Sequence, residues 1–343
     1  MTESLQIPAG IPCARRDASI VSPLRYPGGK RRLVGYIIEA LRLNNLRPKL
    51  YVEPFAGGAS VALQLLNDGW VEQIGLTERD PLVASFWQVV FFDHEWLVEQ
   101  IQEIRPSLEV WQRFRRSRPR STRGRALKCL FLNRTSFSGI LNKSAGPIGG
   151  TLQQSAYSID CRFPKPTLIR RIEQIARLRD RVAFIEQGDW RVTMQRMAHT
   201  GMPKDDLFFY LDPPFYEKAD RLYRFFFRDK DHRLLRDTLT ELDVNYILSY
   251  DPADSIINLY RECAMDLAHV DLLYSAAQNS ELVKARELIV SNLEWLPSAN
   301  RLWRTVGERR KEADIGSLEP YGATLDLRER LPRDILSEVL IPR

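Results

Sequence analysis

Cysteine and histidine are scarce in this chain and scattered along it. There are four of each among 343 residues, and neither set has the paired spacing of a zinc site or a disulfide framework. The cysteines are Cys13, Cys129, Cys161 and Cys263, and the histidines are His94, His199, His232 and His269. We therefore expect reduced thiols, no metal site and a cytoplasmic location.

Long apolar runs are absent as well. No stretch approaches the length of a membrane span, and the start of the chain lacks the apolar core of a signal peptide. The composition is that of a soluble globular protein, 44% hydrophobic and 27% charged. The net charge of +6 favours a polyanionic partner, although many basic proteins bind nothing acidic.

The stretch 207–216, Leu-Phe-Phe-Tyr-Leu-Asp-Pro-Pro-Phe-Tyr, is the most informative part of the sequence. Its apolar run predicts a buried central strand, which must end at Asp212-Pro213-Pro214 because proline cannot donate to a sheet ladder. A carboxylate and the Phe215 ring are thereby placed at the carboxyl edge of a sheet, where open α/β sheets bind ligands. The plain alternative is a Pro-Pro turn beside a solvated aspartate.

These groups suit an exocyclic amino group on an aromatic base. Asp212 can accept one amino hydrogen, the Pro213 carbonyl a second, and Phe215 offers a flat face for stacking. Such an amino group is a poor nucleophile, because its lone pair is delocalised into the ring. Accepting its hydrogens directs that lone pair towards an electrophile.

Two glycine turns precede this stretch. Tyr26-Pro27-Gly28-Gly29-Lys30 leads into a helical pattern, and its backbone N–H groups and Lys30 charge favour an anion such as a carboxylate. Residues 50–60 predict a strand, a turn at Gly57-Gly58 and a helix, the first unit of a nucleotide-binding α/β fold. These glycines do not form the Gly-x-Gly-x-x-Gly fingerprint, which disfavours a nicotinamide cofactor.

Two further acids follow predicted strands. Glu78 ends the strand 73–77, about twenty residues after the glycine turn, where such folds hold ribose hydroxyls. Asp189 follows the strand 182–185 and could accept a hydrogen of an adenine amino group.

Residues 80–180 interrupt the alternation of strands and helices. An aromatic-rich helical pattern over 82–104 is followed by a dense basic run, opposed nearby only by Glu109. Because solvated helix faces normally mix signs, the run favours phosphate contacts. It consists of Arg113, Arg115, Arg116, Arg118, Arg120, Arg123, Arg125 and Lys128. The glycine-rich loop 141–158 fits either a base-reading element or a surface loop without a role.

Four segments together resemble the Dam-type (alpha-class) DNA adenine-N6 methyltransferases, which use S-adenosylmethionine. Tyr26–Lys30 resembles their opening motif, and Glu53-Pro54-Phe55-x-Gly57-Gly58 their cofactor loop. Leu132-Asn133-Arg134 with Phe137-x-Gly139 resembles their DNA-proximal segment, and Asp212-Pro213-Pro214-Phe215 their catalytic tetrapeptide. Phe215 stands where tyrosine is usual and Tyr26 where tryptophan is common, and both changes keep an aromatic face.

By position, the resemblance implies the following roles. The catalytic residues are Asp212, Pro213, Pro214 and Phe215. The cofactor-binding residues are Tyr26, Lys30, Glu53, Phe55, Gly57, Glu78, Asp189 and Asp212. With the basic run, the DNA-binding residues are Arg113, Arg115, Arg116, Arg118, Arg120, Arg123, Asn133 and Arg134.

The expected fold is α/β, a Rossmann-like S-adenosylmethionine-dependent methyltransferase fold with an inserted, mainly helical target-recognition domain. Its expected parts are an arm at 1–21, a catalytic domain over 22–81 and 181–296, the insertion over 82–180 and a C-terminal extension over 297–343. The expected enzyme flips an adenine out of double-stranded DNA. It is expected to be a prokaryotic or phage-encoded monomer in the cytoplasm, associated with the nucleoid, acting alone or with a cognate restriction endonuclease.

Three alternatives stay open. The same tetrapeptide could serve the N4 amino group of cytosine, or an adenine in RNA. Methylation of the cytosine ring carbon is disfavoured, because no Pro-Cys nucleophile is suitably placed. A silent DNA-binding protein that kept the fold would be expected to lose Asp212, Lys30 or the glycine turn, and all are intact.

Overall fold

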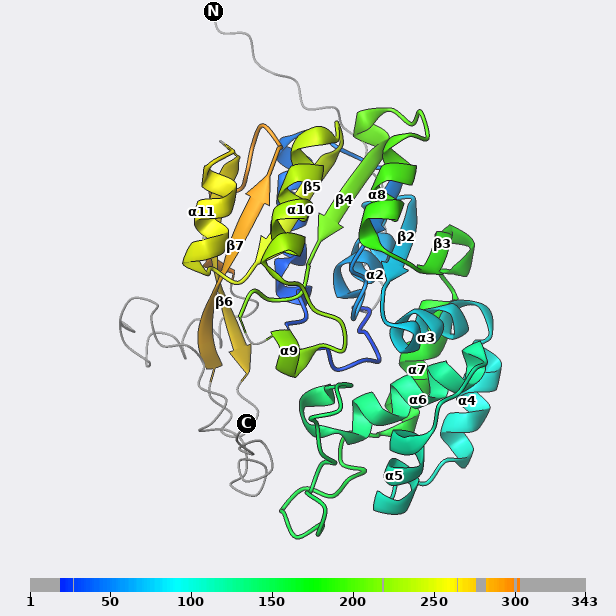
Figure 1. The fold of residues 1–343 in the computed structure, drawn as a ribbon. Helices are drawn as coiled ribbons and strands as arrows, with labels where there is room; N and C mark the ends of the chain where they lie inside the picture. Colours follow the sequence, from blue (N-terminus) through cyan, green and yellow to red (C-terminus); the bar gives the residue numbers. More distant parts are fainter. Residues whose placement is uncertain are drawn as a thin grey trace, which may run out of the picture.

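The computed structural model describes residues 19–26, 28–217, 219–263, 265–275, 282–298 and 301–302 (Figure 1). The predicted arm 1–21 and extension 297–343 lie outside these residues except at their inner ends, and so does Pro27 of the opening motif. Within the described residues, no helix has both the length and the apolar character that crossing a membrane requires.

An eight-stranded mixed sheet forms the centre of the described chain, in the order β3-β2-β1-β4-β5-β7-β6-β8. The strands are β1 (Leu50–Glu53), β2 (Gln73–Glu78), β3 (Val182–Gln187), β4 (Leu207–Leu211), β5 (Asn245–Tyr250), β6 (Asp266–Ser275), β7 (Leu282–Ser291) and β8 (Arg301–Leu302). Pairing is parallel from β3 through β5, and β7 runs antiparallel to β5 and β6. β1, β4 and β5 are buried along their whole length, as expected of central parallel strands.

Helices cover both faces of this sheet (Figure 1). One hydrophobic cluster is formed with α1 (Val34–Leu43), α2 (Ser60–Asn67), α3 (Pro81–Phe92) and α7 (Lys165–Ala176). A second is formed with α8 (Trp190–Ala198), α10 (Asp229–Glu241) and α11 (Asp254–Arg261), and the short α9 (Ala219–Leu222) follows β4. Phe208 enters the first cluster and its neighbour Phe209 the second, because side chains alternate across a strand.

The interruption predicted at 80–180 is mainly helical. Besides α3 and α7 it contains α4 (His94–Glu103), α5 (Leu108–Arg116) and α6 (Thr122–Thr135), which stand beside the sheet (Figure 1). α3 begins where Asp80 accepts a hydrogen bond from Leu82 N at 2.9 Å, with Pro81 in the first helical position. The aromatic pattern over 82–104 forms two helices, because the chain leaves helical geometry at Asp93.

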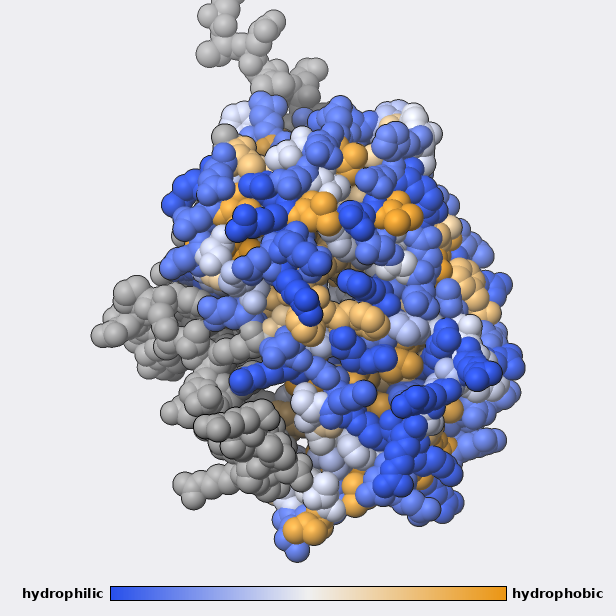
Figure 2. Space-filling view, viewed as in Figure 1, coloured by the Kyte–Doolittle hydropathy of each residue, from blue (hydrophilic) through white to orange (hydrophobic). Residues whose placement is uncertain are grey.

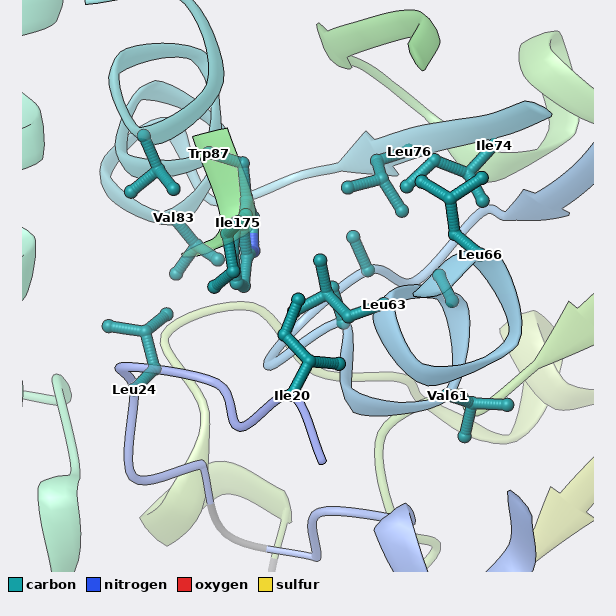
Figure 3. Packing of buried hydrophobic residues seen from close by; sticks show 14 of the residues in the cluster. Ile20, Leu24, Val61, Leu63, Leu66, Ile74, Leu76, Val83, Trp87 and Ile175 are labelled. Atoms are coloured by element: carbon teal, nitrogen blue, oxygen red, sulfur yellow. The ribbon is translucent and has the colours of Figure 1, made fainter. Parts of the chain in front are cut away.

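One buried core joins the sheet to these helices. Figure 3 shows Leu63 of α2, Leu76 of β2, Trp87 of α3 and Ile175 of α7 around the same interior. Trp87 Nε1 also donates to the Gly57 carbonyl at 2.9 Å, which ties α3 to the second glycine turn. α3 and α7 therefore pack against the sheet as well as against the helices of the insertion. The domain limits at 82 and 180 stay a prediction.

Candidate active site

A pocket opens where the strand order reverses. β1 and β4 are neighbours in the sheet, but the chain passes from β1 to β2 on one side and from β4 to β5 on the other. The loops that leave the carboxyl ends of β1 and β4 therefore diverge. Open α/β sheets bind ligands at this position. The pocket encloses about 820 Å³, counting its open mouth. Of the predicted site residues, its lining includes Tyr26, Lys30, Glu53, Phe55, Gly57, Glu78, Asp212 and Pro214.

The Lys30 ammonium pairs with Asp212 at the end of β4. Nζ lies 2.9 Å from Asp212 Oδ1, and Lys30 is only 3% exposed. The sequence predicts that the first glycine turn favours an anion. The anion beside Lys30 is the protein's own Asp212 carboxylate. Burial alone would lower the pKa of Lys30, but the charges of Asp212 and Glu287 outweigh it and raise that pKa. Lys30 therefore stays protonated.

Two hydroxyl groups support the Asp212 carboxylate. Ser249 Oγ donates to Asp212 Oδ1 at 3.3 Å, and Tyr210 OH lies 2.8 Å from Ser249 Oγ. Burial raises the pKa of Asp212, while the Lys30 ammonium and the Ser249 hydroxyl oppose that rise. Both contacts are made to Oδ1, and the Asp212 side chain stays 27% exposed. It can therefore accept a further hydrogen bond from the pocket.

Phe215 lies beside the pocket, packed against the first glycine turn. Lys30 Nζ is 4.9 Å from its ring centroid, and Tyr223, which lines the pocket, meets the ring edge-on at 5.9 Å. Gly28 has φ +74°, and a Cβ there would lie 2.6 Å from Phe215 Cζ. Only glycine permits that approach. One ammonium therefore contacts both the carboxylate and the ring of the tetrapeptide.

Glu78, at the end of β2, holds the second glycine turn. Its Oε2 accepts from Gly57 N and its Oε1 from Asp80 N, both at 2.9 Å. Gly57 has φ +44°, and a Cβ there would lie 2.8 Å from a ring carbon of Tyr26. Burial raises the pKa of Glu78 to about 7, although both backbone hydrogen bonds oppose the rise. This carboxyl group therefore titrates near neutral pH.

Glu53 lies at the end of β1 and is 3% exposed. Its Oε1 accepts from Ala62 N, in the first turn of α2, at 2.8 Å and from Tyr51 OH at 3.4 Å. Burial raises the pKa of Glu53 to about 8. The Glu53 side chain therefore links the end of β1 to the start of α2, where free backbone N–H groups need an acceptor oxygen.

The family model of the D12 class N6 adenine-specific DNA methyltransferases matches residues 26–276. The match contains both glycine turns, Glu78 and the tetrapeptide. The chain belongs to this family. The predicted adenine-N6 methyltransferase activity and Rossmann-like fold are thereby confirmed, and DNA and a methyl donor are the substrates that this family requires.

No curated protein matches the chain. Among solved structures, precorrin 8W decarboxylase from Methanobacterium thermoautotrophicum matches with a TM-score of 0.34 and 11% identity, over 80% of this chain and 98% of that one. Precorrin-6y C5,15-methyltransferase from Geobacter metallireducens matches with a TM-score of 0.33 and 9% identity, over 78% of this chain and 87% of that one. Likeness at this level does not bear on substrate.

In this D12-class chain, Asp189 is the predicted cofactor residue that does not line the pocket. Its Oδ1 accepts from Arg191 N at 3.0 Å and caps α8. Its neighbours Gly188 and Trp190 do line the pocket. The turn after β3 thus reaches the site, and a direct contact of the Asp189 side chain stays a prediction.

The basic run divides into exposed and internally bonded side chains. The exposed members are Arg113 and Arg116 of α5, Arg118 and Arg120 after it, and Arg123 of α6. Of these, Arg123 forms two hydrogen bonds to Asp93, at 2.6 and 2.8 Å, while the less exposed Arg115 lies 5.5 Å from the Trp111 ring. Figure 2 shows that the face over α4 to α6 is mainly hydrophilic. A polyanion therefore has four arginines of the predicted run within reach.

Asn133 and Arg134, which are predicted to contact DNA, are buried and bonded internally, and the DNA contact stays a prediction. Asn133 Oδ1 accepts from Arg25 N at 2.7 Å, and its Nδ2 donates to the Arg25 and Gly139 carbonyls at 2.9 and 2.8 Å. Arg134 Nε donates to the Arg162 carbonyl at 2.6 Å, and its Nη1 donates to the Pro23 carbonyl at 3.4 Å. Both side chains fasten the segment before Tyr26 to α6. Sequence alone did not distinguish this task from DNA contact, since both need polar side chains near one another.

Several contributors to the site were not predicted, among them Ser249, Asp251, Tyr223 and Glu287. Asp251 follows β5 as Asp212 follows β4, and accepts from Tyr216 N at 2.9 Å and Glu217 N at 3.3 Å. The strand-end signal that found Asp212 would also have found Asp251. Glu287 lies inside β7, where no local signal marks it. Among the described residues, no cluster of His, Cys, Asp and Glu is arranged to hold a metal ion.

Proposed function

We propose that the chain is a site-specific DNA methyltransferase that moves the methyl group of S-adenosylmethionine to N6 of an adenine rotated out of the duplex. The observation that carries the proposal is the Lys30 ammonium, which holds the Asp212 carboxylate and the Phe215 ring together beside a pocket at the sheet edge. The family match supports the reaction, and the geometry supports the assignment of roles within it.

The pocket fits an adenosine derivative. Glu78 offers a carboxylate for ribose hydroxyls beside a turn that glycine keeps open. The rings of Phe55, Trp190 and Phe227 form an apolar wall, with centroids 5.6 to 6.1 Å apart. When bound, S-adenosylmethionine supplies a methyl group on a positively charged sulfur. Because the Lys30 ammonium is paired with Asp212, we assign Lys30 to the acceptor side of the site.

Asp212 prepares the amino group of the target adenine. Its carboxylate accepts one amino hydrogen, the Pro213 carbonyl accepts the other, and Phe215 stacks on the base. The amino nitrogen would gain the methyl group and lose one proton to solvent, and the sulfonium donor would become a neutral thioether. No covalent enzyme intermediate is needed, so positioning and fixed charges provide the catalysis.

The target adenine must leave the duplex, because its amino group is otherwise paired and stacked. The exposed arginines of the insertion, Arg113, Arg116, Arg118 and Arg120, bind DNA phosphates and orient the duplex over the pocket. The loop within residues 141–162 reads the sequence. The enzyme works as a monomer in the cytoplasm, next to the nucleoid, either as an orphan methylase or with a restriction endonuclease.

The proposal is tested by expressing the full chain in a host that lacks adenine methylation and sequencing that host's genome for modified bases. We expect N6-methyladenine at one short motif. An Asp212→Ala variant that folds and binds the cofactor should leave the genome unmodified. Substantial methylation by that variant would overturn the role of Asp212.

The nucleoside formed separates the proposal from its rivals. Total DNA and RNA from the same cells are digested, and their methylated nucleosides are identified. N4-methylcytosine in DNA, or methyladenine confined to RNA, would replace the proposed substrate. No modified nucleoside at all, from a folded protein that turns over no cofactor in vitro, would support a silent DNA-binding protein.

A further inference from the structure

Asn142, at the start of the loop 141–162, is bonded to the segment that follows the tetrapeptide. Its Nδ2 donates to the Asp220 carbonyl at 2.5 Å and to the Tyr223 carbonyl at 3.2 Å. Its Oδ1 accepts from Lys143 N at 2.5 Å, which orients the side chain within its own loop. The loop is therefore fastened to α9, which lies between the sheet and the insertion (Figure 1).

The segment 216–224 is held by side chains from other parts of the chain. α9 has four residues, and a helix this short is not stable by itself in water. Asp251, after β5, accepts from the two backbone N–H groups that begin the segment, and Asp80, after β2, pairs with Arg224 at its end. Asn142 bonds the carbonyls between these points, where a helix end leaves them without partners inside the helix. Of these three anchors, Asn142 belongs to the insertion.

Tyr223 connects this attachment to the pocket. Its ring centroid lies 5.9 Å from that of Phe215 in the tetrapeptide and 6.1 Å from that of Tyr26 in the opening motif. Tyr223 itself lines the pocket, as do Phe225 and Phe226 after it. The acceptor side and the predicted cofactor side of the pocket therefore share one ring, and the backbone of that residue is bonded to the loop.

Internal hydrogen bonds stiffen the loop. Gln153 Nε2 donates to the Ile148 and Gly150 carbonyls at 2.8 and 2.6 Å. Its Oε1 accepts from Ile159 N at 3.2 Å. Beside this turn Leu152 is 76% exposed, so the loop offers an apolar side chain to a partner. Because the turn is braced, a displacement of the loop by DNA is transmitted to its first residues.

We propose that Asn142 is a positioning residue that couples target recognition to assembly of the site. When the loop 141–162 lies on its proper duplex sequence, the Asn142 amide holds α9 so that Tyr223 packs against Phe215. On a changed sequence the loop docks differently, and these hydrogen bonds are strained or lost. Asn142 does not line the pocket and acts through α9. The inference rests on the proposed function, because it requires a DNA sequence that the loop reads.

The test compares two duplexes in single-turnover methylation with saturating enzyme and S-adenosylmethionine. One duplex carries the motif found by genome sequencing, and the other has one base pair of that motif changed outside the target adenine. Asn142→Asp keeps the acceptor oxygen for Lys143 N and removes the donor for α9. We expect it to slow the reaction of the motif and to lower the ratio of the two rates roughly tenfold. Asn142→Ala, which adds no charge, should lower the ratio by a similar factor.

Asn44→Asp is the matched control. Asn44, at the end of α1, makes the same kind of contact, since its Nδ2 donates to the Ala40 and Trp295 carbonyls at 2.8 and 2.7 Å. Its Oδ1 accepts from Trp295 N at 3.0 Å. It lies outside the insertion and does not line the pocket. Its replacement should lower the melting temperature and leave the ratio of the two rates unchanged, which separates general loosening from loss of the coupling.

Each outcome bears on the inference. Equal slowing of both duplexes in Asn142→Asp would reduce Asn142 to a structural residue and overturn this inference alone. If neither Asn142 variant folds, the wild type decides by calorimetric titration with S-adenosylhomocysteine, the reaction product, in the presence of each duplex. The motif duplex should raise that affinity more than the changed duplex does, and equal affinities would overturn the inference. A folded wild type that methylates no DNA would remove the proposed function as well.

Discussion

The sheet edge and the helical insertion use charged residues in opposite ways. At the edge, a few charged side chains from distant parts of the chain meet in a buried group, with Lys30 between Asp212 and Glu287. In the insertion, a dense run of arginines lies close together in sequence yet separates in space, some exposed and some bonded internally. Charge density along the sequence is therefore a poor guide here to which charged residues gather in one place.

Breaking one ion pair in each region should give the largest contrast. Lys30→Met removes the ammonium that pairs with Asp212 and with the buried Glu287, which should lower the free energy of unfolding by about 3–5 kcal/mol. Methyl transfer should fall by about 100-fold or more, because Asp212 and Phe215 lose the group that holds them. Arg123→Met removes an exposed pair with Asp93 and should cost at most about 0.5 kcal/mol.

Chemical denaturation and single-turnover methylation measure both variants. If Arg123→Met lowered stability as much as Lys30→Met, the proposed difference between the two regions would be wrong.

The buried polar residues of α6 provide the second test. Asn133→Ala removes three hydrogen bonds to Arg25 and Gly139 and leaves buried backbone groups without partners, so stability should fall by about 3 kcal/mol. The effect should appear without DNA, by thermal unfolding of the free protein. A variant of normal stability that binds DNA poorly would instead restore Asn133 as a DNA contact.

The exposed arginines should affect DNA binding without affecting stability. Replacing Arg113 and Arg116 by Ala removes two candidate phosphate contacts. The slope of log affinity against log salt concentration should therefore become shallower by about 2. Arg123→Ala is the control from the same run, and its slope should change little because its guanidinium is bonded to Asp93. Fluorescence anisotropy with a labelled duplex at several salt concentrations gives both slopes.

The smallest effect is expected from pH. Burial raises the pKa of Glu78 from an ordinary value of 4.5 to about 7. Between these values the folded protein holds a proton that the unfolded chain has released, so the contribution of Glu78 to stability falls as pH rises. Ribose hydroxyls need the ionised carboxylate as acceptor, so cofactor affinity should rise with pH and level off above about 7, by less than about tenfold per unit.

Calorimetric titrations between pH 6 and pH 8 follow this change. Glu78→Gln should bind weakly with little dependence on pH. A wild-type affinity that is flat over this window would show that Glu78 does not titrate with cofactor binding.

Much of the candidate site at the carboxyl edge of the sheet could be predicted, because the sequence patterns that mark it are local. An apolar run that ends in prolines fixes where β4 stops, and the alternation of strands and helices brings such ends to one side of the sheet. Asp212, Glu78 and both glycine turns were found in this way. Glu287 could not be predicted, because it reaches Lys30 only through the antiparallel pairing of β7 with β5. The burial of Asn133 and Arg134 could not be predicted either, because burial cannot be read from a polar dipeptide, and their contact with DNA stays a prediction.

The sequence by itself indicated the reaction class, through motifs that resemble a known family, and it determined the strand that ends at Asp212 and the two glycine turns and Glu78 at the edge of the sheet. The strand and the turns follow from periodicity and from proline and glycine, which act locally. Only the tertiary structure decided which charges are buried, which are paired and which remain free for DNA. The solvation and pairing of a side chain depend on every element packed around it, and most of those elements lie far away along the chain.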